Sequence, residues 1–343
     1  MKFEQTLEIL LVHAQGEIGN VIVNGAPEIP GDTILAKMNW INEVDDSLRR
    51  FVCFEPRANV AMTVNLLLPP CRPGADAAFI VLQPDRTHPM SGSNCICVVT
   101  ALLETGRVEM VEPETVVRLD TAAGLITVRA QCKDGRGLSV SLDNVPAFVQ
   151  QLDAPIETPK WGTIRADIAF GGVFHAQVDV DQVGLTITSD HACDLAEAGI
   201  GIKALLADQI RVVHPEIPSL TEIAYVMLQD YQPDGSVRTC TTLEPGRVDR
   251  SPYGTGSSAN LAVLHARGKL TMGEVHASRS IIGGTFLAEA IGETTVGGRP
   301  AILPRITGSA WIFGRQELRI SPDDRFATGF ALSDPWGPQV GEL

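Results

Sequence analysis

A turn followed by an apolar helix occurs twice in this chain, and it constrains the possible folds more than any other feature. Residues 91–106 (SGSNCICVVTALLETG) and 253–268 (YGTGSSANLAVLHARG) share glycine at the second position, a hydroxyl side chain at the third, leucine at the twelfth and glycine at the sixteenth. The final glycines, Gly106 and Gly268, suit the left-handed position that closes a helix. The two copies therefore predict two similar helices.

The spacing of the copies predicts two similar domains. They begin at Ser91 and Tyr253, which are separated by close to half of the 343 residues. This spacing favours two pseudo-equivalent domains, each with one buried helix wrapped by strands. The alternative is a coincidence between two helix caps, because small residues favour the start of any helix.

Short β-type runs broken by Gly, Pro and Asp make up most of the remaining sequence. Examples are residues 21–23, 79–82, 125–130 and 183–188. Few long helical patterns stand out. Apart from the two copies, we expect helices over residues 34–50, entered through a Pro-Gly-Asp turn, and over residues 194–208.

Charge and cysteine content exclude several kinds of protein. A formal charge of −14 argues against nucleic acid or an anionic membrane surface as a partner, since both select basic patches. The first residues do not resemble a signal peptide, and apolar runs stay far below the roughly 20 residues that span a bilayer. Seven cysteines without a C-x-x-C pair indicate neither a disulfide framework nor a zinc site. We expect a cytoplasmic protein without a metal.

Two helix starts of this kind predict an anion-binding site. A helix N-terminus presents unpaired N–H groups and the positive end of the helix dipole. Two such ends, facing one another across a domain cleft, would hold a small carboxylate and stabilise negative charge at its α-carbon. Ser91 and Tyr253 would then lie on opposite sides of the ligand, as two-base racemases require. Asp249 has the charge to bind an amine; its alternative role is an Asx turn or a cap.

Several blocks of sequence match a known family. The most specific is Asp249-Arg-Ser-Pro-Tyr-Gly-Thr-Gly256. The others, in the family's order, are His13-Ala-Gln-Gly-Glu17, Pro27-Glu-Ile-Pro-Gly31, Phe54-Glu-Pro-Arg57, Met90-Ser-Gly, Ile168-Ala-Phe-Gly-Gly-Val-Phe174, Ile306-Thr-Gly-Ser-Ala310 and Gly329-Phe330. On these blocks, nearly the whole chain resembles the proline racemase family, which includes 4-hydroxyproline epimerases and trans-3-hydroxyproline dehydratases.

The resemblance implies an α/β fold of two pseudo-symmetric halves. Each half would be a mixed or antiparallel sheet wrapped around a central helix, as in diaminopimelate epimerase, with the active site at the interface. The N-terminal half would comprise residues 1–160 and the tail 323–343, and the C-terminal half residues 161–322. We expect no cofactor, a hydroxyproline-like imino acid as the ligand, and a monomer or homodimer.

The departures from the family pattern concern proton transfer. The family's racemases and epimerases carry a cysteine at the positions of Ser91 and Tyr253, and a histidine at that of Ser93. The predicted substrate-binding residues are Gly92, Ser93, Asp249, Gly254, Thr255 and Gly256. Inversion needs a competent proton donor on each face, whereas dehydration needs one base and a leaving group. We therefore expect dehydration of trans-3-hydroxy-L-proline to Δ1-pyrroline-2-carboxylate, with Ser91 nearest the α-proton and Tyr253 on the other face.

Other functions remain open at this point. One is epimerisation of 4-hydroxyproline, or a proline racemase-like reaction, with Ser91 and Tyr253 as unusual bases. Another is a protein that binds an imino acid without turnover. A nicotinamide enzyme is the third, because residues 254–259 fit G-x-G-x-x-A, although that motif should follow a buried parallel strand. His175 either supplies basicity near neutral pH or is an ordinary strand residue.

Overall fold

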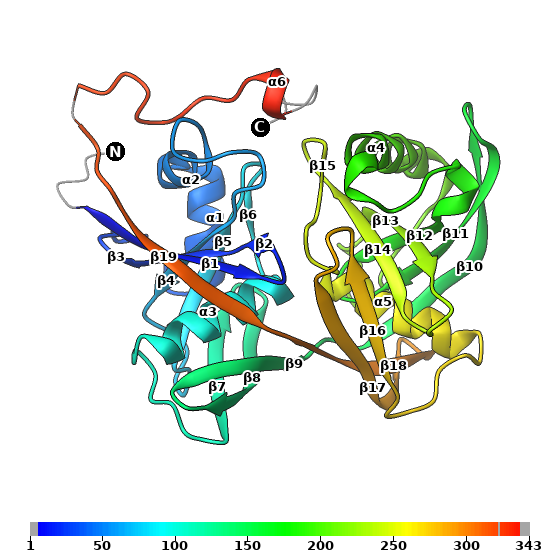
Figure 1. Ribbon diagram of the computed structural model, residues 1–343, viewed down its shortest axis with the longest axis horizontal. Helices are drawn as coiled ribbons and strands as arrows, with labels where there is room; N and C mark the ends of the chain where they lie inside the picture. The colour runs from blue at the N-terminus through cyan, green and yellow to red at the C-terminus, as the bar shows by residue number, and fades with distance from the viewer. Residues whose placement is uncertain (1–5, 322, 337–343) are drawn as a thin grey trace. The chain divides into compact units, whose positions relative to one another are not determined.

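The computed structural model describes residues 6–321 and 323–336 (Figure 1). The chain forms two compact units. Unit 1 comprises Met1–Leu142 and Gly308–Leu343, and unit 2 comprises Asp143–Thr307. Residues 1–5 and 337–343, which the sequence assigned to the N-terminal half, lie outside the described residues.

Unit 1 is built on a mixed sheet. Its strands pair in the order β19, β1, β3, β4, β5, β7, β8, β9; the β3–β4 and β5–β7 pairs are parallel and the others antiparallel. The strands are β1 (Leu7–Ala14), β2 (Glu17–Ile18), β3 (Asn20–Asn24), β4 (Val64–Leu68), β5 (Ala77–Leu82), β6 (Thr87–His88), β7 (Glu114–Thr121), β8 (Gly124–Lys133), β9 (Arg136–Asp143) and β19 (Ala310–Leu318). The helices are α1 (Ile34–Glu43), α2 (Ser47–Cys53), α3 (Gly92–Glu104) and α6 (Ser333–Trp336).

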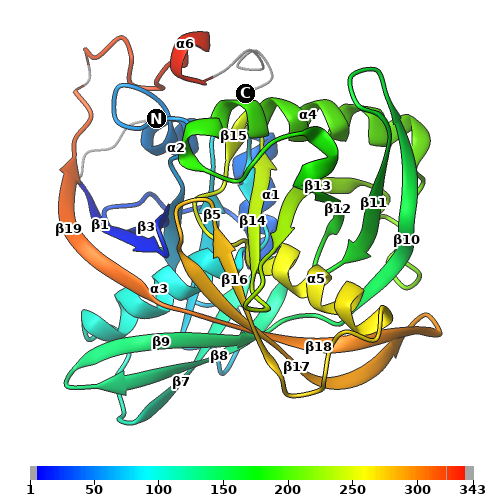
Figure 2. The ribbon, with the colours of Figure 1, turned by 45° about the vertical axis from the view of Figure 1, so that its right-hand side comes forward.

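Unit 2 repeats this pairing order and closes it into a ring. Its strands pair in the order β10, β11, β12, β13, β14, β16, β17, β18, and β18 pairs again with β10. The strands are β10 (Ala147–Thr158), β11 (Gly162–Phe170), β12 (Phe174–Asp179), β13 (Ile223–Tyr231), β14 (Val237–Leu243), β15 (Arg247–Val248), β16 (Val275–Ser280), β17 (Thr285–Val296) and β18 (Arg299–Gly308). The helices are α4 (Ala192–Gln209) and α5 (Gly254–Ala266), with 3-10 turns η1 (Val180–Val183) and η2 (Ser189–His191). Figure 2 shows α4 and α5 on different sides of this sheet.

The two units match strand for strand. In unit 2 the parallel pairs are β12–β13 and β14–β16, at the same places in the order as the two parallel pairs of unit 1. Helix α5 lies between β14 and β16 in the chain, as α3 lies between β5 and β7. The predicted α/β fold of two repeated halves, each with a mixed sheet, is confirmed.

The unit boundaries lie elsewhere than at residues 160/161 and 322/323. A boundary after residue 160 would cut the hairpin of β10 and β11, which pair from Phe148↔Phe170 to Thr158↔Gly162. A boundary after residue 322 would place β19 in unit 2, whereas β19 pairs with β1 along its whole length. In pairing order, β19 holds the place in unit 1 that β10 holds in unit 2.

Helices α3 and α5 are the two predicted copies. Both have 13 residues, and both end at a glycine with positive φ, +70° at Gly106 and +65° at Gly268. The next backbone N–H donates to a leucine carbonyl in both, from Arg107 to Leu102 at 2.9 Å and from Lys269 to Leu264 at 2.8 Å, which is a Schellman motif. Twelve of the 13 residues of α3 and nine of the 13 of α5 are buried, as expected of a helix that strands surround.

Other local predictions had mixed outcomes. The helix predicted over residues 194–208 is α4. The helix predicted over residues 34–50 is divided into α1 and α2, because the Asp45 carboxylate accepts the Ser47 N–H at 2.9 Å and starts a second helix. The strand predicted over residues 183–188 is wrong: the segment leaves η1 through Gly184, whose φ is +68°.

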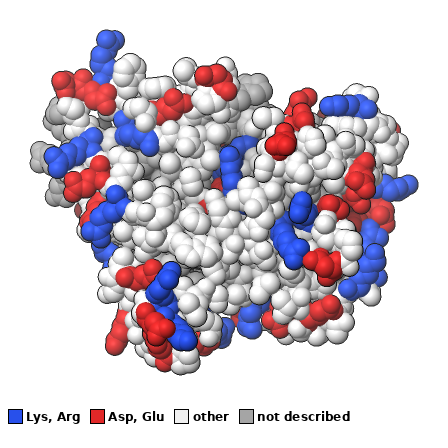
Figure 3. Space-filling model, viewed as in Figure 1, with Lys and Arg blue, Asp and Glu red and all other residues white. Residues whose placement is uncertain are grey.

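Charged side chains of both signs are interspersed on the face of the molecule that Figure 3 shows. On the face shown in Figure 3, Lys and Arg side chains lie among Asp and Glu and do not gather into a basic patch. Among the described residues, no helix is both long and apolar enough to cross a membrane.

Candidate functional site

The N-termini of α3 and α5 share one backbone arrangement. The first α-helical bond runs from Cys95 N–H to the Ser91 carbonyl in α3, and from Ser257 N–H to the Tyr253 carbonyl in α5, at 2.9 Å in both. Neither Ser91 nor Tyr253 caps its helix with its side chain. The first three N–H groups of each helix therefore lack an intrahelical acceptor, which is the arrangement that binds anions at helix N-termini in other proteins. These are the groups of Gly92, Ser93 and Asn94, and of Gly254, Thr255 and Gly256.

Asparagine side chains support the α3 end. Asn94 Nδ2 donates to Ser91 Oγ at 2.9 Å, and Asn94 Oδ1 accepts from Asn65 Nδ2 at 2.8 Å. Asn65, on β4, is fully buried, and its Nδ2 also lies 3.3 Å from the Asn20 carbonyl oxygen. This series of hydrogen bonds fixes which end of the Asn94 amide faces Ser91. Because Ser91 Oγ accepts from Asn94, its own proton remains for donation, either to Ser93 Oγ at 3.2 Å or to a ligand.

Aromatic rings support the α5 end. Tyr253 adopts a φ of +68°, which is unusual for a residue with a bulky side chain, and its N–H donates to Ser251 Oγ at 3.3 Å. Its ring meets those of His175 and Tyr225 edge to face, at centroid distances of 5.6 Å and 5.3 Å. Tyr225 and Thr255 lie close enough to its hydroxyl to affect its pKa, Tyr225 raising it and Thr255 lowering it. Burial, with smaller contributions from Tyr225 and Asp249, raises the pKa of Tyr253 well above 10, so Tyr253 is a neutral proton donor at pH 7.

His175 lies beside Tyr253 as a neutral imidazole. It is fully buried on β12, and burial lowers its pKa to about 4. Its Nδ1 lies 3.1 Å from the Val173 carbonyl oxygen, so Nδ1 carries the proton and Nε2 is left as an acceptor. Nε2 lies 3.4 Å from Thr255 Oγ1. The side chains of Tyr253, Thr255 and His175 thus form a short polar path that ends at a basic nitrogen.

Two glycines explain how α5 comes so close to the strands. A Cβ at Gly171, in the turn between β11 and β12, would overlap the backbone of Thr255 and Ala259. A Cβ at Gly256 would lie 2.7 Å from Met227 Sδ and 3.3 Å from the Tyr253 ring. Asn144 Nδ2 ties this turn to the helix by donating to the Gly171 carbonyl at 2.8 Å and to Ser258 Oγ at 2.9 Å.

Asp249 forms the Asx turn that was the alternative to amine binding. Its Oδ1 accepts the Ser251 N–H at 2.6 Å, and the side chain is buried. The turn sets the approach to Tyr253, because Ser251 in turn accepts the Tyr253 N–H. One turn into α3, Cys95 is fully buried and its pKa is raised to about 12 by burial, so its thiol is packed in the core.

Sequence reasoning missed residues that act through tertiary contacts. Asn94 lies next to the predicted Ser93, and a hydrogen-bonding side chain in the first turn of a helix was a usable signal for it. Asn65 and Tyr225 lie far away in the sequence, and only the pairing of β4 and β13 with their neighbours brings them to α3 and α5. The described residues include no group of three or more His, Cys, Asp or Glu side chains that could hold a metal ion.

The local fold also argues against a nicotinamide-binding turn at residues 254–259. The strand before the Gly254–Gly256 segment is β15, which has two residues and pairs antiparallel with β14. A dinucleotide-binding turn would follow a buried parallel strand.

The fold and the two helix ends define a class that comparison with known proteins identifies. Residues 9–331 match the family model described as proline racemase. The chain is 54% identical to a 4-hydroxyproline 2-epimerase of Rhizobium etli over the full length of both chains. The crystal structure of a hydroxyproline epimerase from Agrobacterium vitis, with bound trans-4-hydroxy-L-proline, has a TM-score of 0.91 at 52% identity and covers 99% of this chain and 100% of its own. That of a probable proline racemase from Agrobacterium radiobacter K84, with bound carbonate, has a TM-score of 0.91 at 53% identity, covering 98% and 100%. The chain belongs to the proline racemase family.

The preference for 3-hydroxyproline dehydration is overturned by these comparisons. Relatives that match the chain over its full length at 51–54% identity are 4-hydroxyproline 2-epimerases, which are isomerases rather than lyases. The prediction rested on the residues at the two helix starts, chiefly Ser91, Ser93 and Tyr253, and gave them more weight than the agreement over the rest of the chain.

Proposed function

We propose that this chain is an isomerase that inverts the α-carbon of 4-hydroxyproline or a closely similar cyclic imino acid. The observation that carries the proposal is the full-length match to 4-hydroxyproline 2-epimerases at 54% identity. The fold adds that both helix N-termini keep uncapped N–H groups suited to a carboxylate. We assign these groups, from Gly92, Ser93, Gly254, Thr255 and Gly256, to the substrate carboxylate, and no metal or organic cofactor to the reaction.

Inversion requires one group that removes the α-proton and another that returns a proton to the opposite face. The proposal gives these roles to Ser91 and Tyr253. The Asn94 amide would stabilise the Ser91 oxygen when it loses its proton, because Asn94 Nδ2 donates to it. Tyr253, which burial keeps protonated, would return a proton to the substrate, and the Thr255 hydroxyl would then stabilise the Tyr253 oxygen, because hydrogen bonding to Thr255 lowers the pKa of Tyr253. Charge that develops on the substrate carboxylate is stabilised by the helix ends.

Asp249 is assigned to the substrate amine. Its carboxylate is buried beside the first turn of α5, and its charge is opposite to that of an ammonium group. The Asx turn does not compete with this role, since a carboxylate has lone pairs for more than one donor.

The test is incubation with trans-4-hydroxy-L-proline in heavy water. The expected product is cis-4-hydroxy-D-proline with one deuterium at the α-carbon, detected by NMR and chiral chromatography, and no imine is trapped by o-aminobenzaldehyde. L-Proline is the matched substrate without the ring hydroxyl, and we expect slower inversion of it. Tight binding of 4-hydroxyproline without inversion or α-deuteration would sink the proposal.

The second candidate is a protein that binds an imino acid without turnover. The replacement of thiols at both proton-transfer positions favours it, because serine and tyrosine hydroxyls are weaker acids than a cysteine thiol. The same incubation separates the two candidates, since a binding protein would leave both the configuration and the α-proton unchanged.

A further inference from the structure

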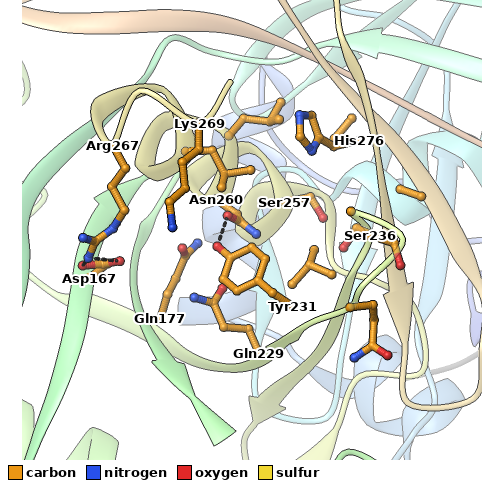
Figure 4. Close-up of a pocket in the computed structure, with 18 of the residues that line it drawn as sticks. Asp167, Gln177, Gln229, Tyr231, Ser236, Ser257, Asn260, Arg267, Lys269 and His276 are labelled. Atoms are coloured by element: carbon orange, nitrogen blue, oxygen red, sulfur yellow. Dashed lines mark hydrogen bonds and ion pairs between the residues drawn. The ribbon is translucent and has the colours of Figure 1, made fainter. Parts of the chain in front are cut away.

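A cavity of about 900 Å³ lies within unit 2, on the side of α5 (Figure 4). Its walls come from α5 and from strands β11, β12, β13, β14 and β16, so it belongs to this unit alone. The volume falls in the range of small-molecule pockets. Among the residues assigned to the proposed reaction, none lines it.

Four residues that line the cavity carry buried polar atoms without a hydrogen-bond partner. Gln177 and Gln229 are 2% and 5% exposed, and the Oε1 atom of each is buried without a partner. Ser278, 2% exposed, has an unpartnered Oγ, and His276 Nε2 has no closer partner than the Glu274 carboxylate at 3.8 Å. A buried polar atom without a partner costs about 1–3 kcal/mol. Their gathering around one cavity indicates an occupant that supplies N–H or O–H donors.

The charged side chains that line the cavity indicate which net charge a ligand there would have. The lining holds five carboxylates and four Lys or Arg cations, so a ligand with a large net charge of either sign is disfavoured. Arg267 is neutralised by Asp167 at 2.7 Å, and Arg279 by Asp234 at 3.0 Å. Lys269 extends into the cavity from the C-terminal end of α5 (Figure 4), and among the described residues no carboxylate lies within ion-pair distance of it.

We propose that this cavity is a second binding site, which takes a small zwitterionic amino or imino acid. The ammonium group donates to the amide oxygens of Gln177 and Gln229, and the carboxylate pairs with Lys269. Tyr231 completes the wall as a neutral phenol; it donates to Asn260 Oδ1 at 2.9 Å.

Gln177 connects this site to the first turn of α5. Its Nε2 donates to the Gly256 carbonyl at 3.1 Å, while its Oε1 is buried without a partner in a residue that lines the cavity. A ligand that binds Oε1 therefore holds the side chain that also holds Gly256. The site is nevertheless independent of the proposed reaction, because binding requires no proton transfer.

The probe is α-methyl-L-proline, a zwitterion without an α-proton, so binding is read without turnover and does not depend on epimerase activity. Binding is measured by calorimetry, and the ligand is located in crystals soaked with the probe. We expect it in the cavity, and we expect Lys269→Met, a change at an exposed side chain, to weaken binding there about tenfold or more. Lys160→Met is the matched control on the surface of the same unit, and Gln229→Leu removes an amide oxygen from the cavity lining.

Two analogues test the zwitterion assignment. Cyclopentanecarboxylate lacks the amine and pyrrolidine lacks the carboxylate, so each should bind more weakly than α-methyl-L-proline. Water molecules alone in the cavity at saturating probe, or binding that neither Lys269→Met nor Gln229→Leu changes, would overturn the site. Equal affinity for cyclopentanecarboxylate would overturn the zwitterion as its ligand.

Discussion

The N-termini of α3 and α5 have the same backbone hydrogen bonds and very different surroundings. At α3, Ser91 adopts extended backbone geometry and contacts side-chain amides. At α5, Tyr253 adopts a left-handed conformation and contacts aromatic rings and a neutral imidazole. The fold thus repeats the uncapped helix start, whereas the side chains around each start differ. In the proposed reaction, these side chains set the proton-transfer chemistry separately at each end.

The comparison makes the two proposed acid–base groups inequivalent. Ser91 depends on donated hydrogen bonds, because a serine oxygen becomes a base only when its negative charge is stabilised. Tyr253 depends on a nearby hydroxyl that stabilises its oxygen, because burial opposes the loss of its proton. Changes at one end should therefore differ in kind from changes at the other.

The largest expected effect follows removal of either hydroxyl. Ser91→Ala and Tyr253→Phe should each lower kcat for inversion of 4-hydroxyproline by about 10²-fold or more, since inversion needs both groups. In heavy water, each variant should still exchange the α-proton of one epimer, and the epimer should differ between the variants. Exchange is measured by proton NMR on the separate epimers.

The control is Ser219→Ala in an exposed loop of unit 2, which should behave as the unchanged chain. If both variants exchange the same epimer, Ser91 and Tyr253 do not serve opposite faces, and the comparison between the two ends loses its functional meaning.

The second prediction concerns the imidazole at the α5 end. The pKa of His175 is about 4 in the folded chain and about 6.5 when unfolded. Between these values the unfolded chain binds a proton that the folded chain does not, so the free energy of unfolding rises with pH from about 4 to 6.5. The neutral His175 accounts for about 3 kcal/mol of this change in the free energy of unfolding. This amount is fully present above pH 6.5 and is lost as the pH falls towards 4.

His175→Asn should remove most of this difference, because an amide can still donate to the Val173 carbonyl and does not titrate. Urea unfolding at pH 4.5 and pH 7 measures the effect, with His191→Asn as the control. An unchanged pH dependence in His175→Asn would mean that His175 is not held neutral.

The backbone features that the two helix starts share could be predicted from the sequence, whereas the side-chain surroundings in which they differ could not. The helix starts, the closing glycines and the repeat depend on local rules, and residues 91–106 and 253–268 displayed them. The exchange of β19 for β10 in the two sheets depends on pairing between strands far apart in the chain, which no local pattern encodes. The side chains around the helix starts could not be predicted for the same reason, because Asn65 and Tyr225 reach the helix starts from β4 and β13.

The third prediction tests whether Asp249 adds an amine site to the α5 end or only shapes its turn. Asp249→Asn keeps the oxygen that accepts the Ser251 N–H and removes the charge. Affinity for 4-hydroxyproline should fall by about 10- to 100-fold, since a charge-assisted contact is worth about 1.5–3 kcal/mol. Pyrrole-2-carboxylate, whose nitrogen is uncharged, should bind as before. Calorimetry measures the affinity for both ligands. If Asp249→Asn weakens the binding of both equally, Asp249 only forms the turn and does not bind the amine.

The smallest effect is expected at the amide that supports Ser91. Asn94→Ala removes the hydrogen bond to Ser91 Oγ and should lower kcat by about 2- to 12-fold, as the loss of about 0.5–1.5 kcal/mol implies, with little change in KM. Because Asn94 would act through Ser91, the Ser91→Ala/Asn94→Ala double variant should be no slower than Ser91→Ala alone. Asn94→Gln is the matched variant that keeps an amide but displaces it, and it should resemble Asn94→Ala. Steady-state kinetics in both directions measure these effects, and additive losses in the double variant would place Asn94 in the packing of α3 instead.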